Sequence, residues 1–253
     1  MTDPGAYRTL YIDIETAPNT AHVWSLWKQT ISLSQLMESG RVISFAWKWR
    51  GEPETHFLSE FHVDHAAMID AAHGLLSQAD VVGHYNGKRF DMPTLNREFV
   101  VAKLGPPAPY QQLDFLETVK RRFRFPSNKL DYVAQQLGLA GKVKHEGHTL
   151  WVRCMAGDPE AWELMKLYNM QDVVLLEQLH DRLMPWLVGA PNQRLVVDGD
   201  DVCPHCGSED LRREGYALTS TGRYQRFQCR GCGAWSRATR RFDGTDTRPV
   251  SAT

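Results

Sequence analysis

Asp13 and Glu15 occupy alternate positions of an apolar run from Leu10 to Thr16 near the start of the chain. Successive side chains of a β-strand point to opposite faces, so these two carboxylates would share one face of such a strand. Two anions this close repel each other unless a cation lies between them, which favours a divalent metal ion. The alternative is a strand whose polar face looks at water, because Asp-x-Glu is a common short match.

Two further acids fall on helices expected later in the chain. Asp91 stands two residues before Pro93, which suits the first turn of a helix, so an N-terminal cap is the simple interpretation of Asp91. Tyr168 and Asp172 are four residues apart in a long helix expected from Pro159 to about Leu187, which puts the phenol and the carboxylate on one face. Taken alone, this pair is best explained as a hydrogen bond at the surface.

Four cysteines form two Cys-x-x-Cys pairs separated by 22 residues: Cys203, Cys206, Cys229 and Cys232. This spacing is typical of a structural zinc site with four thiolates, in which each pair forms one knuckle and a hairpin lies between them. Two redox motifs are the weaker alternative. We therefore predict one structural Zn²⁺ in a zinc ribbon, and we expect the remaining Cys154 to be a buried thiol.

The elements between these residues follow the order of an α/β domain. The segment from Arg41 to Arg50 alternates apolar and polar residues, which predicts a half-buried strand, and Thr55–Leu58 is expected to pair with it as a hairpin. An amphipathic helix over 64–78 then leads into a short buried strand over 81–84, which indicates a parallel crossover. Two shorter elements complete the pattern, a strand over 113–115 and a helix over 129–139.

An insertion from Ala17 to Gly40 separates the first two expected strands and contains Trp24 and Trp27. Exposed tryptophans can stack on nucleobases, but tryptophans more often pack an insertion against the core of its domain. We therefore expect both side chains to be packed.

Basic side chains gather in the C-terminal part of the chain. From Leu211 to Arg241 there are eight arginines and one acid, a formal charge of +7, so the remaining residues carry −8 of the total of −1. Arginines among aromatic residues suit phosphate contacts and base stacking, and Arg223 and Arg226 are the candidates for such contacts. Protein docking and a solvated arginine face are the alternatives.

The acids and the tyrosine also fall in the order of three exonuclease motifs. The first carboxylate pair is followed by Asp91, which comes after the segment Gly83–Gly87, and then by Tyr168 four residues before Asp172. The chain therefore resembles the DEDD-type 3′–5′ exonucleases of the ribonuclease-H-like superfamily, which includes the proofreading domains of DNA polymerases.

The resemblance is specific enough to indicate a subclass. The tyrosine four residues before Asp172 resembles the tyrosine subclass, and the position five residues before Asp172 is Leu167, which excludes the histidine subclass. The likeness covers about Arg8 to Leu187. Within it, Ser127–Tyr132 resembles the segment between the second and third motifs of polymerase-linked members, and Asp114 stands where many relatives have an aspartate.

The resemblance implies an α/β fold, a ribonuclease-H-like mixed sheet flanked by helices, and a site for two Mg²⁺ or Mn²⁺ ions. The residues that it implies as metal ligands are Asp13, Glu15, Asp91 and Asp172. Two such ions roughly 3.5–4 Å apart can activate a water molecule and relieve charge on the leaving oxygen, and Tyr168 would orient that water. The residues expected to line the pocket for the terminal nucleotide are Ile14, Thr16, Asn86 and Phe90.

We therefore predict a 3′–5′ exonuclease that acts on nucleic acid, with single-stranded DNA favoured over RNA. The alternatives are an RNA-processing exonuclease or a structure-specific endonuclease on the same fold, and a catalytically inert nucleic-acid-binding adaptor. A chain of 253 residues can bury one large core and a small accessory module. The expected parts are an exonuclease domain over 1–190, a linker over 191–200, a zinc ribbon over 201–242 and a flexible tail over 243–253.

Stand-alone exonuclease chains of this kind resemble those of phage genomes. The expected partners besides nucleic acid are a polymerase or another replication or repair protein, which would act in trans. The first eight residues are polar and lack the apolar core of a signal peptide, and no apolar run is long enough to span a bilayer. We therefore expect a soluble, intracellular (cytoplasmic) protein.

Overall fold

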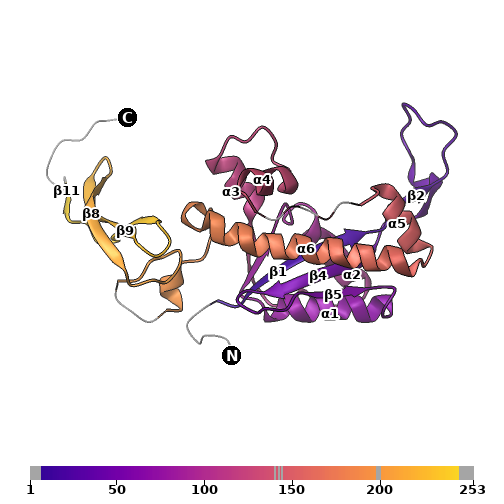
Figure 1. Cartoon of the computed structure of the whole chain (residues 1–253), viewed down its shortest axis with the longest axis horizontal. Coiled ribbons are helices and arrows are strands. Elements are labelled where there is room, and N and C mark those ends of the chain that lie inside the picture. The colour runs from indigo at the N-terminus through magenta and orange to yellow at the C-terminus, as the bar shows by residue number, and fades with distance from the viewer. Residues whose placement is uncertain (1–6, 140, 142, 144, 198–200, 245–253) are drawn as a thin grey trace. The chain divides into compact units, whose positions relative to one another are not determined.

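A computed structural model describes residues 7–139, 141, 143, 145–197 and 201–244. Contacts within the chain divide it into two compact units (Figure 1). The larger unit is Arg8–Leu179, and the smaller one is formed mainly by the segment that begins at His180. The predicted boundary at residue 190 between an exonuclease domain and a linker stays a prediction.

A five-stranded mixed sheet forms the centre of the larger unit (Figure 1). Its strands are β1 (Thr9–Thr16), β4 (Val42–Trp49), β5 (His56–Ser59), β6 (Val81–His84) and β7 (Gln111–Asp114). They lie in the order β5-β4-β1-β6-β7, in which β4 is antiparallel to β1 and β5, whereas β1, β6 and β7 are parallel. The predicted mixed sheet, with its hairpin between the second and third strands, is confirmed.

Six α-helices are packed around this sheet in the described part of the chain. They are α1 (His65–Gln78), α2 (Asp91–Val101), α3 (Phe115–Arg122), α4 (Leu130–Gln136), α5 (His148–Met155) and α6 (Pro159–Leu183). The Asp64 carboxylate accepts a hydrogen bond from the backbone N–H of Ala66 at 3.0 Å and so caps α1. No described helix is long and apolar enough to cross a membrane.

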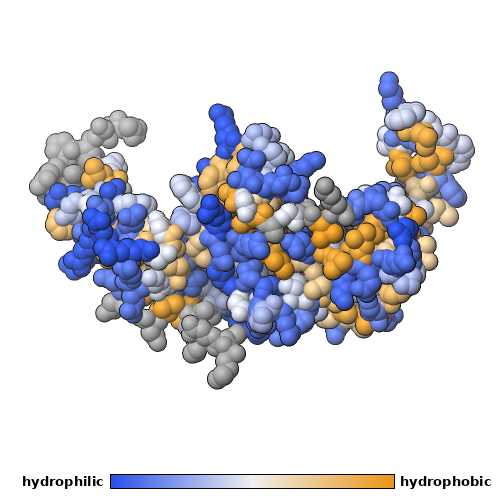
Figure 2. All heavy atoms as spheres, in the orientation of Figure 1, coloured by the Kyte–Doolittle hydropathy of each residue, from blue (hydrophilic) through white to orange (hydrophobic). Residues whose placement is uncertain are grey.

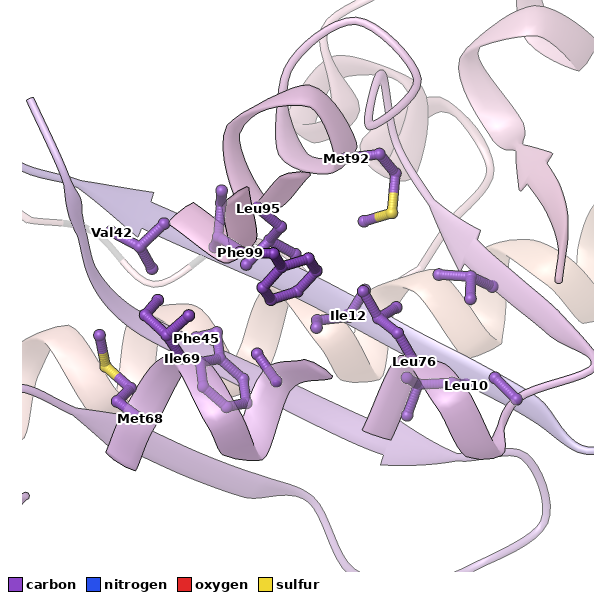
Figure 3. Packing of buried hydrophobic residues seen from close by; sticks show 14 residues of the cluster. Leu10, Ile12, Val42, Phe45, Met68, Ile69, Leu76, Met92, Leu95 and Phe99 are labelled. Carbon is purple, nitrogen blue, oxygen red and sulfur yellow. The ribbon is translucent and has the colours of Figure 1, made fainter. Parts of the chain in front are cut away.

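The main core lies between the sheet and helices α1 and α2 (Figure 3). Its large buried side chains include Leu10 and Ile12 of β1, Phe45 of β4, Met68, Ile69 and Leu76 of α1, and Leu95 and Phe99 of α2. Burying one such side chain contributes about 1.5–3 kcal/mol to stability. Since Leu10, Ile12 and Ile14 occupy this core, the intervening residues of β1 must point to the opposite face.

The opposite face of β4 is buried as well, which corrects the prediction of a half-buried strand. Helix α6 runs across this face (Figure 1), and Lys48 of β4 lies 3.2 Å from Glu177 of α6. Ser44 is fully buried, with its hydroxyl 3.5 Å from the amide oxygen of Asn169. The polar residues that alternate along β4 predicted an exposed face. They are buried because their partners lie on α6, which is distant in the sequence.

The insertion forms an arm, defined here as residues 17–40, that folds on itself (Figure 1). Its short strands β2 (Thr20–Ala21) and β3 (Leu36–Glu38) pair antiparallel, with a 3₁₀ turn at Leu33–Gln35. Trp24 and Trp27 are 86% and 81% exposed, so the prediction that they pack against the core is wrong. The two ends of the arm pair with each other, and both indole rings are left in solvent.

The smaller unit contains a four-stranded sheet built around β9 (Gly222–Cys229). The strands β8 (Leu211–Leu218), β10 (Trp235–Arg237) and β11 (Asp243–Gly244) all pair antiparallel with β9. The predicted hairpin between the two cysteine pairs is therefore confirmed. Two 3₁₀ segments, η2 (Met184–Trp186) and η3 (Gln193–Leu195), precede this sheet.

The sheet of the smaller unit extends two residues beyond the predicted C-terminal end of the ribbon at residue 242. β11 places Asp243 opposite Arg223 of β9, so the first two residues of the predicted flexible tail belong to the sheet. Residues 245–253 of that tail, and residues 198–200 of the predicted linker, lie outside the described residues.

Candidate active site and zinc site

Strand β1 carries Asp13 and Glu15 on the face that α6 covers. The alternation of β1 turns Ile12 and Ile14 into the core and the two carboxylates away from it, and both carboxylates remain partly exposed. The prediction that they share one face of a strand is confirmed. The alternative, a strand whose polar face looks only at water, does not fit these two carboxylates, because α6 covers this face.

Asn169 of α6 holds the first of these carboxylates. Its side-chain amide donates to Asp13 Oδ2 at 2.8 Å and to the Asp13 carbonyl oxygen at 3.1 Å, and Asn169 is fully buried. Sequence reasoning missed this residue. The signal was present, because Asn169 stands three residues before Asp172 and shares its helical face.

Asp91 is the first residue of α2 and not its cap. The capping position is Phe90, whose side chain makes no capping bond, and Asp91 itself is only 5% exposed. The backbone N–H of Ile14 donates to Asp91 Oδ1 at 3.3 Å, which ties the start of α2 to β1. Burial raises the pKa of Asp91 to about 6, although the Ile14 hydrogen bond acts in the opposite direction.

Tyr168 stands among the carboxylates. Burial raises its pKa far above the usual value, and the negative charges of Glu15, Asp172 and Asp13 raise it further. The phenol therefore stays protonated through the neutral range and can donate a hydrogen bond, but it cannot serve as a base there. The hydrogen bond between Tyr168 and Asp172 replaces the surface pair that the sequence alone allowed.

Two aromatic residues that the sequence did not indicate pack on Tyr168. The rings of His145 and Tyr168 are 4.7 Å apart at their centroids, and the ring of Trp151 in α5 lies 6.2 Å from that of Tyr168. Since α5 was not expected from the sequence, this aromatic wall of the site was not either.

The four acids and Tyr168 line one cavity of about 250 Å³. The other residues that line it are Ile14, Tyr85, Asn86, Phe90 and Leu130. Three of the four residues predicted to contact the terminal nucleotide therefore line the cavity, whereas Thr16 is not among the described residues that line it. Tyr85 and Leu130 are additional, and the Tyr85 hydroxyl donates to the carbonyl oxygen of Asn128 at 2.7 Å.

The cavity offers oxygen donors and no cationic side chain among its described lining residues. Hard divalent ions such as Mg²⁺ and Mn²⁺ prefer carboxylate and water oxygens, so the donor set fits them. The raised pKa of Asp91 also favours a cation site, because no positive charge offsets this buried acid. The oxygens of four carboxylates that share two ions can lie farther apart than the ligand oxygens of a single ion.

A hydrogen-bonded network holds the loop that carries Asn86. The Asp114 carboxylate accepts from the backbone N–H of Asn86 at 2.9 Å and from that of Leu116 at 3.0 Å, where it caps α3. His84 Nδ1 accepts from the backbone N–H of Gly87 at 3.1 Å, and burial lowers the pKa of His84. Asn86 has a φ of +69°, a strained conformation that this network maintains.

The four predicted cysteines come together in the smaller unit. Cys203 Sγ lies 3.7 Å from Cys232 Sγ, and Cys206 Sγ lies 3.6 Å from Cys229 Sγ. Ligands at 2.3 Å from a tetrahedral Zn²⁺ would be about 3.8 Å apart, so the spacing fits zinc. Among the described residues, this is the one group of three or more potential ligands whose donor atoms all lie within 4.8 Å of one another.

The four thiols differ in acidity. Burial raises the pKa of Cys203 to about 11 and also raises that of Cys232, although backbone N–H groups act in the opposite direction at both. Burial raises the pKa of Cys229. Hydrogen bonds from the backbone N–H groups of Cys232 and Gly231 and from neighbouring thiols outweigh burial and lower this pKa to about 7. Cys154 is outside the cluster, 2% exposed, and burial raises its pKa to about 11. The prediction of a buried thiol is confirmed for it.

The two predicted nucleic-acid contacts of the ribbon lie on β9. The Arg223 guanidinium is 4.9 Å from the ring centroid of Tyr216 and 3.7 Å from the carboxylate of Asp243. The Arg226 guanidinium lies 4.6 Å over the ring of Trp235, and its Nε donates to the carbonyl oxygen of Glu214. Stacking on aromatic rings leaves both cations partly exposed on the sheet.

The fold and the site together define a ribonuclease-H-like domain joined to a four-cysteine β-sheet unit. Residues 10–184 match the family model RNase_H_2 of the RNase H superfamily, which is more than half of the chain. The chain therefore belongs to the RNase H superfamily. No curated protein matches the chain.

The fold is also similar to part of a solved DNA polymerase. The structure of the family B DNA polymerase from the hyperthermophilic archaeon Pyrobaculum calidifontis matches with a TM-score of 0.57 and 19% sequence identity. The match covers 71% of this chain and 25% of the polymerase, so the chain spans about a quarter of that protein. At this identity the likeness shows a shared fold.

Proposed function

We propose that this protein is a metal-dependent 3′–5′ exonuclease that hydrolyses terminal phosphodiester bonds of nucleic acid, with single-stranded DNA favoured over RNA. The observation that carries the proposal is the convergence of Asp13, Glu15, Asp91, Asp172 and Tyr168 on one cavity. Membership of the RNase H superfamily and the order of the three motifs support it. The presence of all four acids and the tyrosine argues against an inert adaptor.

The four carboxylates would hold two Mg²⁺ or Mn²⁺ ions, which when bound promote ionisation of water and offset charge on the leaving oxygen. The Tyr168 phenol is protonated through the neutral range, and once ions occupy Asp172 it would turn from that carboxylate to donate the hydrogen bond that orients the attacking water. Asn169 fixes the rotamer of Asp13. Phe90, 46% exposed at the mouth of the cavity, offers its ring to the terminal nucleotide beside Ile14 and Asn86.

The test uses single strands of DNA and RNA labelled at either end, incubated with Mg²⁺ or Mn²⁺. The proposal expects stepwise release of mononucleotides from the 3′ end, faster for DNA than for RNA. Internal cleavage would support the endonuclease alternative, and faster release from RNA would support the RNA-processing alternative. The variants Asp13→Ala and Asp172→Asn should abolish release while the protein stays folded. Wild-type turnover in either variant would overturn the assignment of these residues.

For the smaller unit we infer one structural Zn²⁺ and a contribution to nucleic-acid binding. The cluster of four thiols supports the metal, and the exposed arginines of β9 support the binding. Each phosphate contact to a single strand adds about 0.7 to the slope of log affinity against log salt. Arg223→Gln and Arg226→Gln should each lower that slope by about this amount, and deletion from Val197 onward should lower it further. Unchanged affinity and slope would favour protein docking, for which a polymerase in trans stays a prediction.

A further inference from the structure

The arm carries the two most exposed tryptophans among the described residues. Besides Trp24 and Trp27, the residues Leu26 and Leu33 are 82% and 88% exposed. Apolar side chains gather visibly over this segment at the upper right of Figure 2, where Figure 1 labels β2. Single exposed apolar residues need no explanation, but a cluster on one protruding element indicates an interaction surface.

Hydrogen bonds tie the two ends of the arm to each other. The backbone N–H of His22 donates to the Gln35 carbonyl oxygen at 2.9 Å, and the Gln35 side chain donates back to the His22 carbonyl oxygen at 2.9 Å. At its base, Arg97 donates to the Gly40 carbonyl oxygen at 2.7 Å. These bonds hold the two sides of the arm together around residues 23–31, which carry both tryptophans.

The base of the arm adjoins the acidic cavity. The arm begins directly after Thr16, the last residue of the strand that carries Glu15, and Ala17 packs in the same apolar cluster as Tyr168. Trp24 follows Glu15 by nine residues, which a fully extended chain would span in about 32 Å. About ten stacked nucleotides of a single strand cover that distance, so a strand that ends in the cavity can reach the arm.

The charge of the arm does not oppose a polyanion. Residues 17–40 contain one base, Lys28, and one acid, Glu38 near the base of the arm, so the formal charge of the arm is 0, although the chain as a whole has 30 acids. Phosphates that pass residues 17–37, where no acid occurs, therefore meet less repulsion than an acidic loop of this chain would cause. Tryptophan rings stack on any base, which suits a surface that must accept successive nucleotides.

We infer that the arm is a stacking surface for single-stranded nucleic acid whose 3′ end lies in the acidic cavity, and that Trp24 and Trp27 hold bases upstream of the scissile bond. This inference rests on the proposed function, since it takes the cavity as the place of the 3′ end. The arm would then set affinity for long substrates without taking part in the reaction.

The test compares Trp24→Ala/Trp27→Ala with wild type on two probes. Binding of 5′-fluorescein-labelled dT20 is followed by anisotropy in EDTA, and hydrolysis of dT20 and of the dinucleotide dTpdT is followed in Mg²⁺. Loss of a stacked base costs about tenfold in affinity or more, so we expect at least that loss for dT20 binding and a matching rise in KM. The kcat for dT20 and the kcat/KM for dTpdT should not change.

Two control variants separate base stacking from other roles. Trp24→Phe/Trp27→Phe should restore most of the affinity, because a smaller aromatic ring still stacks. Met37→Ala should leave dT20 binding unchanged, because Met37 is exposed on the same arm but has no ring that stacks on a base. Unchanged dT20 affinity in the tryptophan variant, or an equal loss in Met37→Ala, would overturn the inference and favour an apolar protein partner. If wild type hydrolyses neither probe, the proposed function fails, while anisotropy still decides whether the arm binds nucleic acid.

Discussion

Asn169 of α6 donates its side-chain amide to both the carboxylate and the carbonyl oxygen of Asp13 on β1, at 2.8 and 3.1 Å. This pair of bonds links residues 156 positions apart and fixes the direction in which the Asp13 carboxylate points. Residues that orient a metal ligand are worth about 10–100-fold in metal affinity or activity.

We therefore expect Asn169→Ala to raise the Mn²⁺ concentration needed for half-maximal activity by about 10–100-fold. Titration of activity with Mn²⁺ measures this shift, and saturating metal should recover part of the rate. Ser44→Ala is the matched control, because Ser44 contacts Asn169 only at 3.5 Å and its loss should change the titration little. An unshifted titration for Asn169→Ala would show that Asp13 is oriented without it.

Tyr168→Phe removes a hydrogen-bond donor and leaves an aromatic ring of nearly the same size. Because burial and three carboxylates hold the pKa of Tyr168 far above neutrality, the phenol does not titrate in the working range. We expect kcat to fall by about 10²-fold or less, with no change in the shape of the pH–rate profile. Loss of a titration limb in the variant between pH 6 and 9 would mean that the tyrosine acts as a base after all.

Asp91→Asn should stabilise the metal-free protein at alkaline pH. The folded-state pKa of Asp91 is about 6, above its usual value of 3.8, so its contribution to stability is lost as pH rises through 6. In EDTA at pH 8 the asparagine variant should be more stable on the order of 1–3 kcal/mol, and this gain should vanish below pH 4. Conversely, Mg²⁺ should raise the Tm of wild type only. A variant less stable than wild type in EDTA would show that the carboxylate is already compensated.

The parts of the site that could be predicted are those with a local signature. Alternation along β1 is enough to place Asp13 and Glu15 on one face, and the spacing of the cysteines is enough to indicate zinc. That Asp91 and Asp172 join them could be inferred only by resemblance to a family, because no local pattern links segments so far apart. From position alone, a helix cap is the better interpretation of Asp91.

What could not be predicted depends on partners supplied by distant segments. The buried polar face of β4 is stable only because Glu177 and Asn169 of α6 meet Lys48 and Ser44 there. Trp24 is exposed for the opposite reason, because no distant segment among the described residues covers its ring. The hydrogen bonds of the arm join its own two ends. In both cases the residue types suggested the opposite burial.

Cys206→Ser should remove the zinc and unfold the smaller sheet without affecting the larger unit. Structural Zn²⁺ sites contribute about 10–16 kcal/mol of binding energy, which the β8–β9 hairpin would lose. Metal analysis should find one zinc per chain in wild type and a large loss in the variant, and hydrogen exchange should lose protection over 211–229 only. Cys154→Ala is the control, because this buried thiol lies outside the cluster. Loss of zinc in that control, or retention in Cys206→Ser, would contradict the site.

His84 should make the protein sensitive to acid. Burial holds its folded-state pKa below 6.5, so beneath pH 6.5 the unfolded chain binds a proton that the folded protein does not, and stability falls as the pH falls. A single such group adds at most about 1.4 kcal/mol per pH unit to the slope. His84→Asn, whose side-chain oxygen can still accept from Gly87, should show a shallower decline in urea unfolding between pH 7 and 5. Identical slopes would mean that the charge of Asp114, 3.7 Å from His84 Nδ1, compensates the imidazolium.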